Sequence, residues 1–206
     1  MRKPNPHAAA QRHLSRRCPI LKGVIERVGP CGLVPQSEDP FTLLVRCVIS
    51  QQISTKAARS IYDRLAALVG GPPIAMDAVE SLADDHLAAC GISGPKRRTL
   101  RALAAHFDAN PHILPGIADR DDDLIREQLV AIKGIGPWSV DMFLMFGIAR
   151  TDVLPVSDFG IRAGVKKLFS LAEMPKPAEL QKIAEPWKPY RTIACWYVWR
   201  SLENEA

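Results

Sequence analysis

The sequence lacks any grouping of residues that would hold zinc. Its five cysteines are widely spaced and include no C-x-x-C pair, and its five histidines include no H-x-x-x-H pair. Structural zinc sites need such short spacings between their ligands. We therefore expect no zinc site, and we interpret the cysteines as reduced, mostly buried thiols: Cys18, Cys31, Cys47, Cys90 and Cys195.

The chain also lacks a long hydrophobic run. Although 47% of the residues are hydrophobic, no apolar stretch approaches the roughly 18 residues that a bilayer crossing requires. With 24% charged residues, the composition is typical of a soluble globular protein. A chain of 206 residues can bury one core, or two small helical lobes that share one. We expect one compact unit and no membrane partner.

Acidic residues are missing from the N-terminus. None occurs before Glu26, whereas the net charge of the whole chain is +5 and its pI is about 9.1. This balance suits a polyanionic partner. The basic segment is either a solvated, partly disordered tail or an arm that contacts phosphates; a mitochondrial presequence is a weaker third interpretation, because no clean amphipathic helix is visible. Its basic residues are Arg2, Lys3, Arg12, Arg16, Arg17 and Lys22.

Nearly every periodic segment has the helical period, with apolar residues three and four positions apart, so the sequence predicts an all-α fold. One helix starts after Pro40, and Ser54 or Thr55 caps the next, which the glycines and prolines at 70–73 stop. The apolar stripe of the first consists of Phe41, Leu44, Val45, Val48 and Ile49, and the second runs through the apolar residues Ala57, Ala58, Ile61, Leu65 and Leu68. Further helices are expected over residues 76–82, 84–89, 96–107, 122–133, 137–148, 159–169, 177–185 and 189–202.

Two glycines, Gly134 and Gly136, separate the helices predicted at 122–133 and 137–148. Glycines allow a sharp turn and a close approach to a phosphate, and the first N–H groups of the following helix form an anion site together with the helix dipole. Lys133 adds a positive charge. The alternative is a tight turn in which the glycines have only a steric role. The two helices can be held together by Leu129, Ile132, Ile135, Val140, Phe143 and Leu144.

Several segments together resemble one family. The hairpin is followed by an acid at 158, and it is accompanied by VISQQIS at 48–54, GISGPKR at 91–97, WKPYRT at 187–192 and CWYVWR at 195–200. The chain resembles, over roughly residues 41–202, the helix-hairpin-helix (HhH-GPD) base-excision DNA glycosylases, and within them the 3-methyladenine DNA glycosylase II branch. The resemblance implies a two-lobed helical bundle with the DNA cleft between the lobes. It assigns DNA-backbone contacts to Lys133, Gly134, Ile135, Gly136, Trp138 and Ser139.

The resemblance also implies the chemistry. Asp158 stands where the family has its catalytic aspartate, which stabilises the oxocarbenium-like sugar when the base departs. The alternative is that Ser157 or Asp158 only caps the helix at 159–169, although the two roles are compatible. Members that also nick the strand have a lysine where this chain has Trp138, so we expect no lyase activity. Iron–sulfur members have four clustered cysteines near the C-terminus, where this chain has only Cys195, so we expect no cluster.

The target base must leave the stack, and a side chain must fill the gap. The resemblance assigns this wedge to Gln51, Gln52 and Ile53, with Gln52 first and Ile53 second. The alternative is that the two glutamines bond backbone groups at a helix junction. The implied base pocket consists of Trp138 and Met142, with Phe41, Trp196 and Trp199 as weaker candidates for which core packing is the alternative. Some relatives have tyrosine in place of Met142, which puts the strength of stacking in doubt.

The prediction is a monofunctional, monomeric DNA glycosylase that removes alkylated purines, chiefly 3-methyladenine, with 7-methylguanine and related lesions as further candidates, from double-stranded DNA. A noncatalytic DNA-binding repair module and a glycosylase for mismatched or oxidised bases are the alternatives. We expect no cofactor beyond a monovalent cation at the hairpin, and a location in the bacterial cytoplasm and nucleoid or the eukaryotic nucleus. The single domain would comprise a basic arm and first helix (1–40), a central lobe (41–150) with the helix-hairpin-helix at 122–148, and C-terminal helices (151–206) that complete the second lobe.

Overall fold

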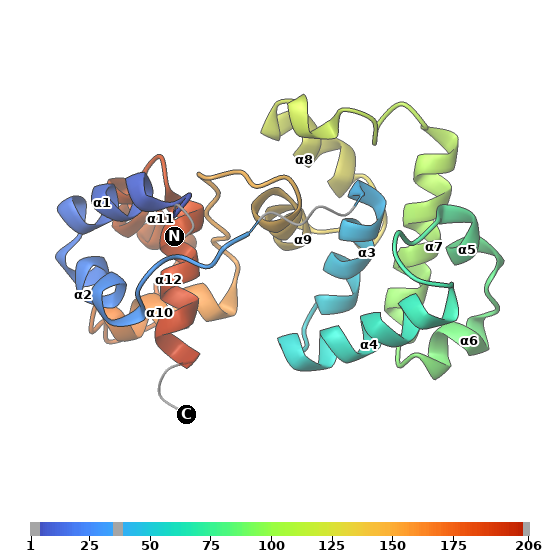
Figure 1. Ribbon diagram of the computed structural model, residues 1–206, viewed down its shortest axis with the longest axis horizontal. Coiled ribbons are helices and arrows are strands. Elements are labelled where there is room, and N and C mark those ends of the chain that lie inside the picture. The colour runs from blue at the N-terminus through green and yellow to red at the C-terminus, as the bar shows by residue number, and fades with distance from the viewer. Residues whose placement is uncertain (1–4, 35–38, 204–206) are drawn as a thin grey trace. The chain divides into compact units, whose positions relative to one another are not determined.

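Every regular element in the described part of the chain is helical. The computed structural model describes residues 5–34 and 39–203, and it has no strand in these ranges (Figure 1). The expected all-α fold is therefore confirmed. The elements are α1 (Ala8–Arg17), α2 (Pro19–Val28), α3 (Pro40–Ser50), α4 (Thr55–Leu68), α5 (Met76–Ser81), α6 (Asp84–Ala89), α7 (Gly94–Ala109), η1 (Ile117–Asp119), α8 (Asp122–Val130), α9 (Pro137–Met142), η2 (Phe143–Gly147), α10 (Phe159–Leu168), α11 (Pro177–Ala184), η3 (Glu185–Trp187) and α12 (Arg191–Glu203).

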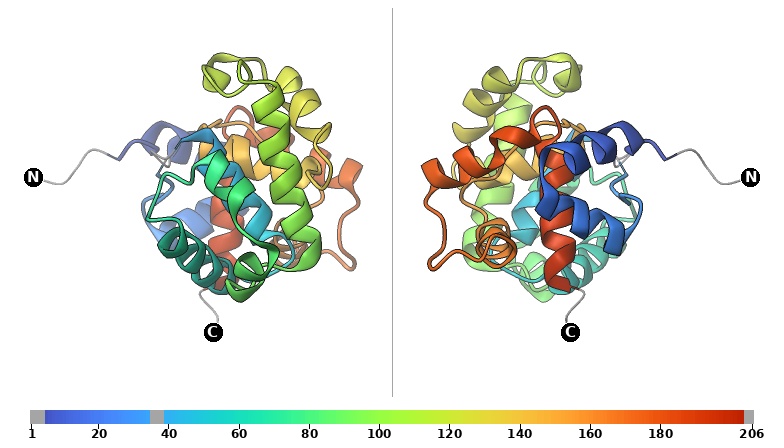
Figure 2. Two further views of the ribbon diagram at one scale, coloured as in Figure 1. Left: turned by 90° about the vertical axis from the view of Figure 1, so that its right-hand side faces the viewer. Right: turned by 90° about the vertical axis from the view of Figure 1, so that its left-hand side faces the viewer.

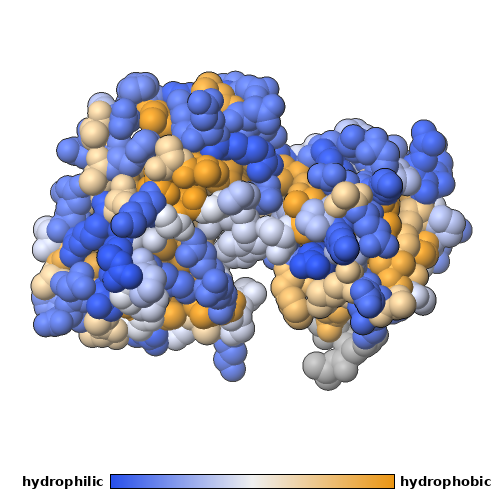
Figure 3. Space-filling view, turned by 180° about the vertical axis from the view of Figure 1, so that it is seen from behind, coloured by the Kyte–Doolittle hydropathy of each residue, from blue (hydrophilic) through white to orange (hydrophobic). Residues whose placement is uncertain are grey.

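The helices form two compact units. The central unit is the chain between Val34 and Ala149, and the terminal unit combines the chain up to Val34 with the chain from Ala149 onward. Each unit has its own core of fully buried apolar side chains. Figure 3 shows that hydrophilic side chains are interspersed with hydrophobic ones on the outer surface of both units. None of the described helices has the length and apolarity that a bilayer crossing requires.

Helix α3 is the centre of the central unit. Eight of its 11 residues are buried, because α4, α7, α9 and η2 all pack against it (Figure 2). The buried surface is therefore wider than the expected stripe. Its one buried polar side chain, Thr42, accepts a hydrogen bond from the backbone N–H of Ile74 at 2.8 Å, and Asp39 caps the helix by accepting from the N–H of Thr42 at 3.1 Å. A helix buried on most sides gives a rigid base to the loop that follows it.

Helix α4 is capped as predicted, and its buried face includes a tyrosine. The side chain of Ser54 accepts a hydrogen bond from the N–H of Ala57 at 3.3 Å. Of its apolar residues, Ala58 and Leu65 are buried together with Tyr62, whereas Ala57 and Leu68 are exposed. The aromatic ring decides the buried face because it removes more apolar area from water than an alanine does, and the guanidinium of Arg46 lies 3.7 Å from its centroid.

The N-terminal basic segment is folded. Helices α1 and α2 pack against each other and against α12 (Figure 2), and they bury Leu14, Leu21 and Val24 completely or nearly so. These apolar residues recur at helical spacing between the basic ones, which lie on the exposed face. The interpretation as a partly disordered tail is therefore wrong for residues 8–28. Arg2 and Lys3 lie outside the described residues.

All five cysteines are free and buried, as the sequence predicts. Burial raises the pKa of Cys31 to about 11 and that of Cys47 to about 12. Both thiols therefore stay protonated at neutral pH, which makes them weak nucleophiles and weak metal ligands.

Candidate DNA-binding hairpin and catalytic carboxylate

The hairpin joins α8 to a helix that changes its pitch. Helix α8 ends at Val130, three residues before the predicted end, and α9 continues into the π-helical turn η2. Gly134 has a φ of +93°, and a Cβ there would lie 2.0 Å from the hydroxyl oxygen of Thr99. Only glycine fits both requirements. The apolar residues predicted to join the two helices are all buried: Leu129, Ile132, Ile135, Val140, Phe143 and Leu144.

Gly136 differs from Gly134. Its φ of −110° is open to any residue, and a Cβ there would meet nothing within 4 Å. The chain's own packing therefore does not require glycine at the start of α9. Its missing side chain leaves the backbone accessible there, which is the property that a close approach to a phosphate needs.

The remaining predicted hairpin residues fall into different environments. Lys133 is exposed, and Trp138 is half-buried. Ser139 is only 2% exposed, and its hydroxyl accepts a hydrogen bond from Nε2 of Gln51 at 2.9 Å. The DNA contact predicted for Ser139 would therefore have to come from its backbone.

The predicted wedge loop is tied to the hairpin through Gln51. Nε2 of Gln51 also donates to the backbone carbonyl of Gly134 at 3.1 Å. The alternative interpretation, a glutamine that bonds backbone groups at a helix junction, thus describes Gln51. Gln52 and Ile53 are exposed, and Gln52 has a left-handed φ of +57°. At the base of this loop, Nζ of Lys96 donates to the carbonyl of Ile49 at 2.7 Å, and burial lowers the pKa of Lys96.

The candidate catalytic acid is the N-cap of α10. Oδ1 of Asp158 accepts a hydrogen bond from the N–H of Ile161 at 2.7 Å and another from Nε1 of Trp199 at 3.0 Å. The side chain is 9% exposed. The capping interpretation therefore holds. Because the helix dipole favours a negative charge at this end, the same position also suits an ionised carboxylate.

The predicted pocket residues do not share one environment. Phe41 is buried in the core of the central unit, where its ring packs edge-on against Phe107. Met142, in the same unit, is 7% exposed. Trp196 belongs to the terminal unit, where it is half-buried and the guanidinium of Arg200 lies 5.2 Å from its ring centroid. The core-packing alternative therefore describes Phe41.

Sequence reasoning missed one residue next to the carboxylate, Phe159, and the contact that another residue, Trp199, makes with it. Phe159, the first residue of α10, is 72% exposed. It lies outside the buried face of α10, which includes Ile161 and Val165. A large aromatic residue outside the apolar stripe of a helix was a signal visible in the sequence. Trp199 was considered only for pocket or core, and its bond to Asp158 spans 41 positions, so no local pattern could have revealed it.

The described residues contain no group of three or more His, Cys, Asp or Glu side chains that could hold a metal ion. In the hairpin, the carbonyl of Ile132 accepts from the N–H of Ile135 at 3.0 Å, and the monovalent cation at the hairpin stays a prediction.

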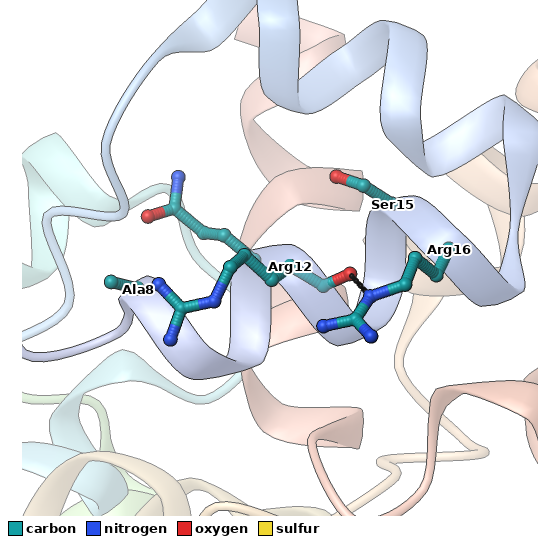
Figure 4. A pocket seen from close by; sticks show the side chains of 5 residues that line it. Ala8, Arg12, Ser15 and Arg16 are labelled. Atoms are coloured by element: carbon teal, nitrogen blue, oxygen red, sulfur yellow. Dashed lines mark hydrogen bonds between the residues drawn. The ribbon is translucent and has the colours of Figure 1, made fainter.

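A shallow hollow on the surface of α1 contains none of the predicted site residues (Figure 4). It is lined by Ala8, Gln11, Arg12, Ser15 and Arg16.

Comparison with known proteins settles the family. The HhH-GPD superfamily base excision DNA repair protein model matches residues 45–189. This chain belongs to that superfamily. A match that includes the loop at 51–53, the hairpin and Asp158 confirms the resemblance inferred from those segments. Because the superfamily acts in base excision repair of DNA, DNA is the substrate.

Individual relatives agree with this family. The chain is 30% identical to an alkylbase DNA glycosidase-like protein of Schizosaccharomyces pombe over 97% of its own length and 96% of the relative's. It is 33% identical to the DNA-3-methyladenine glycosylase 1 of the same yeast over 81% of this chain and 74% of that one. The solved structure of that yeast's 3-methyladenine DNA glycosylase in complex with abasic DNA matches with a TM-score of 0.86 and 30% identity, over 95% of this chain and 97% of the other.

Proposed function

We propose that this protein is a monofunctional DNA glycosylase that hydrolyses the N-glycosidic bond of alkylated purines, 3-methyladenine foremost, in double-stranded DNA. The observation that carries the proposal is the carboxylate of Asp158, held at the N-terminus of α10 by two N–H donors. The same superfamily model covers the hairpin and this acid, and similar proteins are named 3-methyladenine DNA glycosylases.

The reaction needs a fixed negative charge beside the sugar. When the C1′–N bond breaks, the base leaves with the bonding electron pair, and positive charge develops on C1′ and the ring oxygen. The carboxylate of Asp158 would stabilise that charge while water adds to C1′ and releases a proton. A methylated purine with a formal positive charge leaves as a neutral base. It therefore needs less acid catalysis of its departure than an unmodified base does.

The hairpin and the loop at Gln52 would supply binding. The open backbone at Gly136 and the charge of Lys133 suit phosphate contacts, which hold the duplex without reading its sequence. Since Gln51 is engaged by the hairpin, we assign the wedge to Gln52 and Ile53, which are exposed. The half-buried indole of Trp138 would favour a cationic base through its electron-rich face.

We further propose that the protein has no lyase activity and acts as a monomer. Schiff-base chemistry needs an amine at the reacting carbon, and the position of the lyase lysine is occupied by Trp138. Lys133 lies on the other side of the hairpin glycines. Strand nicking that persists in purified protein without added base or heat would contradict the first of these proposals.

The test compares two aspartates that cap helices. Asp158→Asn keeps an acceptor for the cap but removes the charge, and we expect release of 3-methyladenine from alkylated duplex to slow about 100-fold or more. Asp39→Asn makes the same change at the N-cap of α3, and we expect a rate within about twofold of wild type. High-performance liquid chromatography of free bases measures both. If Asp158→Asn releases base as fast as wild type, the assignment of the carboxylate is wrong; if the unmodified protein releases none, the noncatalytic alternative is correct.

A further inference from the structure

The indole of Trp199 and a backbone amide converge on one oxygen of the candidate catalytic carboxylate. Nε1 of Trp199 donates to Oδ1 of Asp158 at 3.0 Å, and the N–H of Ile161 donates to the same atom at 2.7 Å. Trp199 belongs to α12 and Ile161 to α10. Donors that approach one oxygen from two helices fix the rotation of the carboxylate about its Cβ–Cγ bond, which for an isolated aspartate is a broad, soft torsion. They thereby also fix the direction of Oδ2.

Two glycines of α10 leave the space that α12 and its indole occupy. A Cβ at Gly160 would lie 2.9 Å from Nε1 of Trp199 and 3.2 Å from Oδ1 of Asp158. One turn later, a Cβ at Gly164 would lie 2.5 Å from a side-chain carbon of Val198. Close approach of α12 therefore requires small residues at both positions. The two glycines let α12 pack closely enough for its tryptophan to reach the N-cap of α10.

We propose that Trp199 is a positioning residue for base excision, acting through Asp158. The inference rests on the proposed function, because it assigns to Trp199 the orientation of the carboxylate that stabilises the departing sugar. A carboxylate that is 9% exposed has few water partners, and a preoriented charge stabilises the transition state without reorganising during the reaction. A hydrogen bond to a charged acceptor is also stronger than one between neutral groups.

The first experiment separates rate from binding. In Trp199→Phe the ring stays aromatic but the donor is lost. We expect single-turnover release of 3-methyladenine to slow about 10-fold, which is typical for loss of one hydrogen bond to a charged group. The dissociation constant for duplex DNA with an abasic site should stay within about twofold, since binding does not use the carboxylate's orientation. Gly160→Ala should likewise slow release and leave the dissociation constant within about twofold, because its Cβ displaces the indole.

A matched control separates the hydrogen bond from the loss of an indole. Trp187 is fully buried in the terminal unit, and its Nε1 has no hydrogen-bond partner among residues 5–34 and 39–203. Trp187→Phe should lower the melting temperature and leave the release rate of the folded protein within about twofold of wild type. If Trp187→Phe slows release as much as Trp199→Phe does, the effect comes from packing and the proposal is overturned.

A double-mutant cycle decides between action through Asp158 and a general structural role. In the Asp158→Asn background the charge is already absent, so Trp199→Phe should cost no more than about twofold. An equal 10-fold loss in both backgrounds, or a single variant as fast as wild type, would overturn the inference while leaving the proposed function intact. A wild-type rate in Asp158→Asn alone is a different result, which would overturn the proposed function itself.

Discussion

The central and terminal units hold their candidate functional groups by opposite means. In the central unit, side chains fix the backbone by donating hydrogen bonds to its carbonyls: Gln51 donates to the carbonyl of Gly134, and Lys96 donates to the carbonyl of Ile49. In the terminal unit, N–H donors hold a side chain, the carboxylate of Asp158. A shaped backbone suits phosphate binding, and a fixed carboxylate suits chemistry. Affinity for DNA and the rate of base release should therefore respond to different substitutions: those in the hairpin and its loop should lower affinity, and those around Asp158 should lower the rate.

Among variants of the hairpin and its surroundings, Gly134→Ala in the central unit should have the largest effect. Alanine there would need a left-handed backbone and would collide with Thr99, so Gly134→Ala should lower the free energy of unfolding by about 2–4 kcal/mol. Affinity for duplex DNA should fall by more than about 10-fold, because the hairpin cannot keep its shape. Urea unfolding and fluorescence anisotropy measure the two effects.

The matched variant is Gly136→Ala. Its backbone and surroundings accept a methyl group, so we expect stability to change by less than about 1 kcal/mol while affinity for DNA falls about 10-fold. Wild-type affinity in this variant would show that no phosphate approaches the start of α9.

Replacing Phe159 tests whether the terminal unit contributes an aromatic contact with the nucleotide as well as the negative charge of Asp158. The ring is 72% exposed, so Phe159→Ala should leave the melting temperature unchanged. We expect kcat/KM for base release to fall about 5- to 10-fold, because a ring beside the carboxylate would pack against the extruded nucleotide. Val34, 71% exposed in the same unit, provides the control: Val34→Ala should behave like wild type. Equal kinetics for the two variants would remove Phe159 from the site.

The two glutamines of the loop in the central unit should have different effects when each is replaced by alanine. Gln52→Ala should reduce base extrusion about 3- to 5-fold, measured by 2-aminopurine fluorescence beside the lesion, with no change in unfolding. Gln51→Ala removes two hydrogen bonds that link the loop to the hairpin, so it should lower stability by about 1–2 kcal/mol. The reverse assignment of these effects would make Gln51 the wedge.

The smallest effect is expected at Lys133. Lys133→Gln should weaken binding of all duplex sequences alike and reduce the slope of log K against log salt by about one. Lys182, exposed on α11 in the terminal unit, is the control, and Lys182→Gln should keep the wild-type slope. An unchanged slope for Lys133→Gln would mean that Lys133 touches no phosphate.

Local signals in the sequence predicted most helix ends well. The span of α6 at 84–89 and the cap of α4 at Ser54 agree with the structure, since capping and short loops depend on neighbouring residues. The predicted helix ends were wrong where contacts between distant residues compete with these local signals. Helix α8 ends at Val130 because the chain must turn to place Gly134 against Thr99. The basic N-terminus was misjudged because its buried residues are sparse between arginines.

The all-helical fold, the glycine hairpin, the family and an acid at a helix start could all be predicted from the sequence, because periodicity, glycine spacing and motif order are local properties. Three further features follow from the packing of the helices: Trp199 donates a hydrogen bond to Asp158, Gln51 donates one to the hairpin, and the first helices pack on α12. Gln51 and Gly134 are 83 positions apart, and Trp199 and Asp158 are 41 apart. Such pairs meet only when helices pack, and packing depends on the shape of whole surfaces rather than on any short pattern.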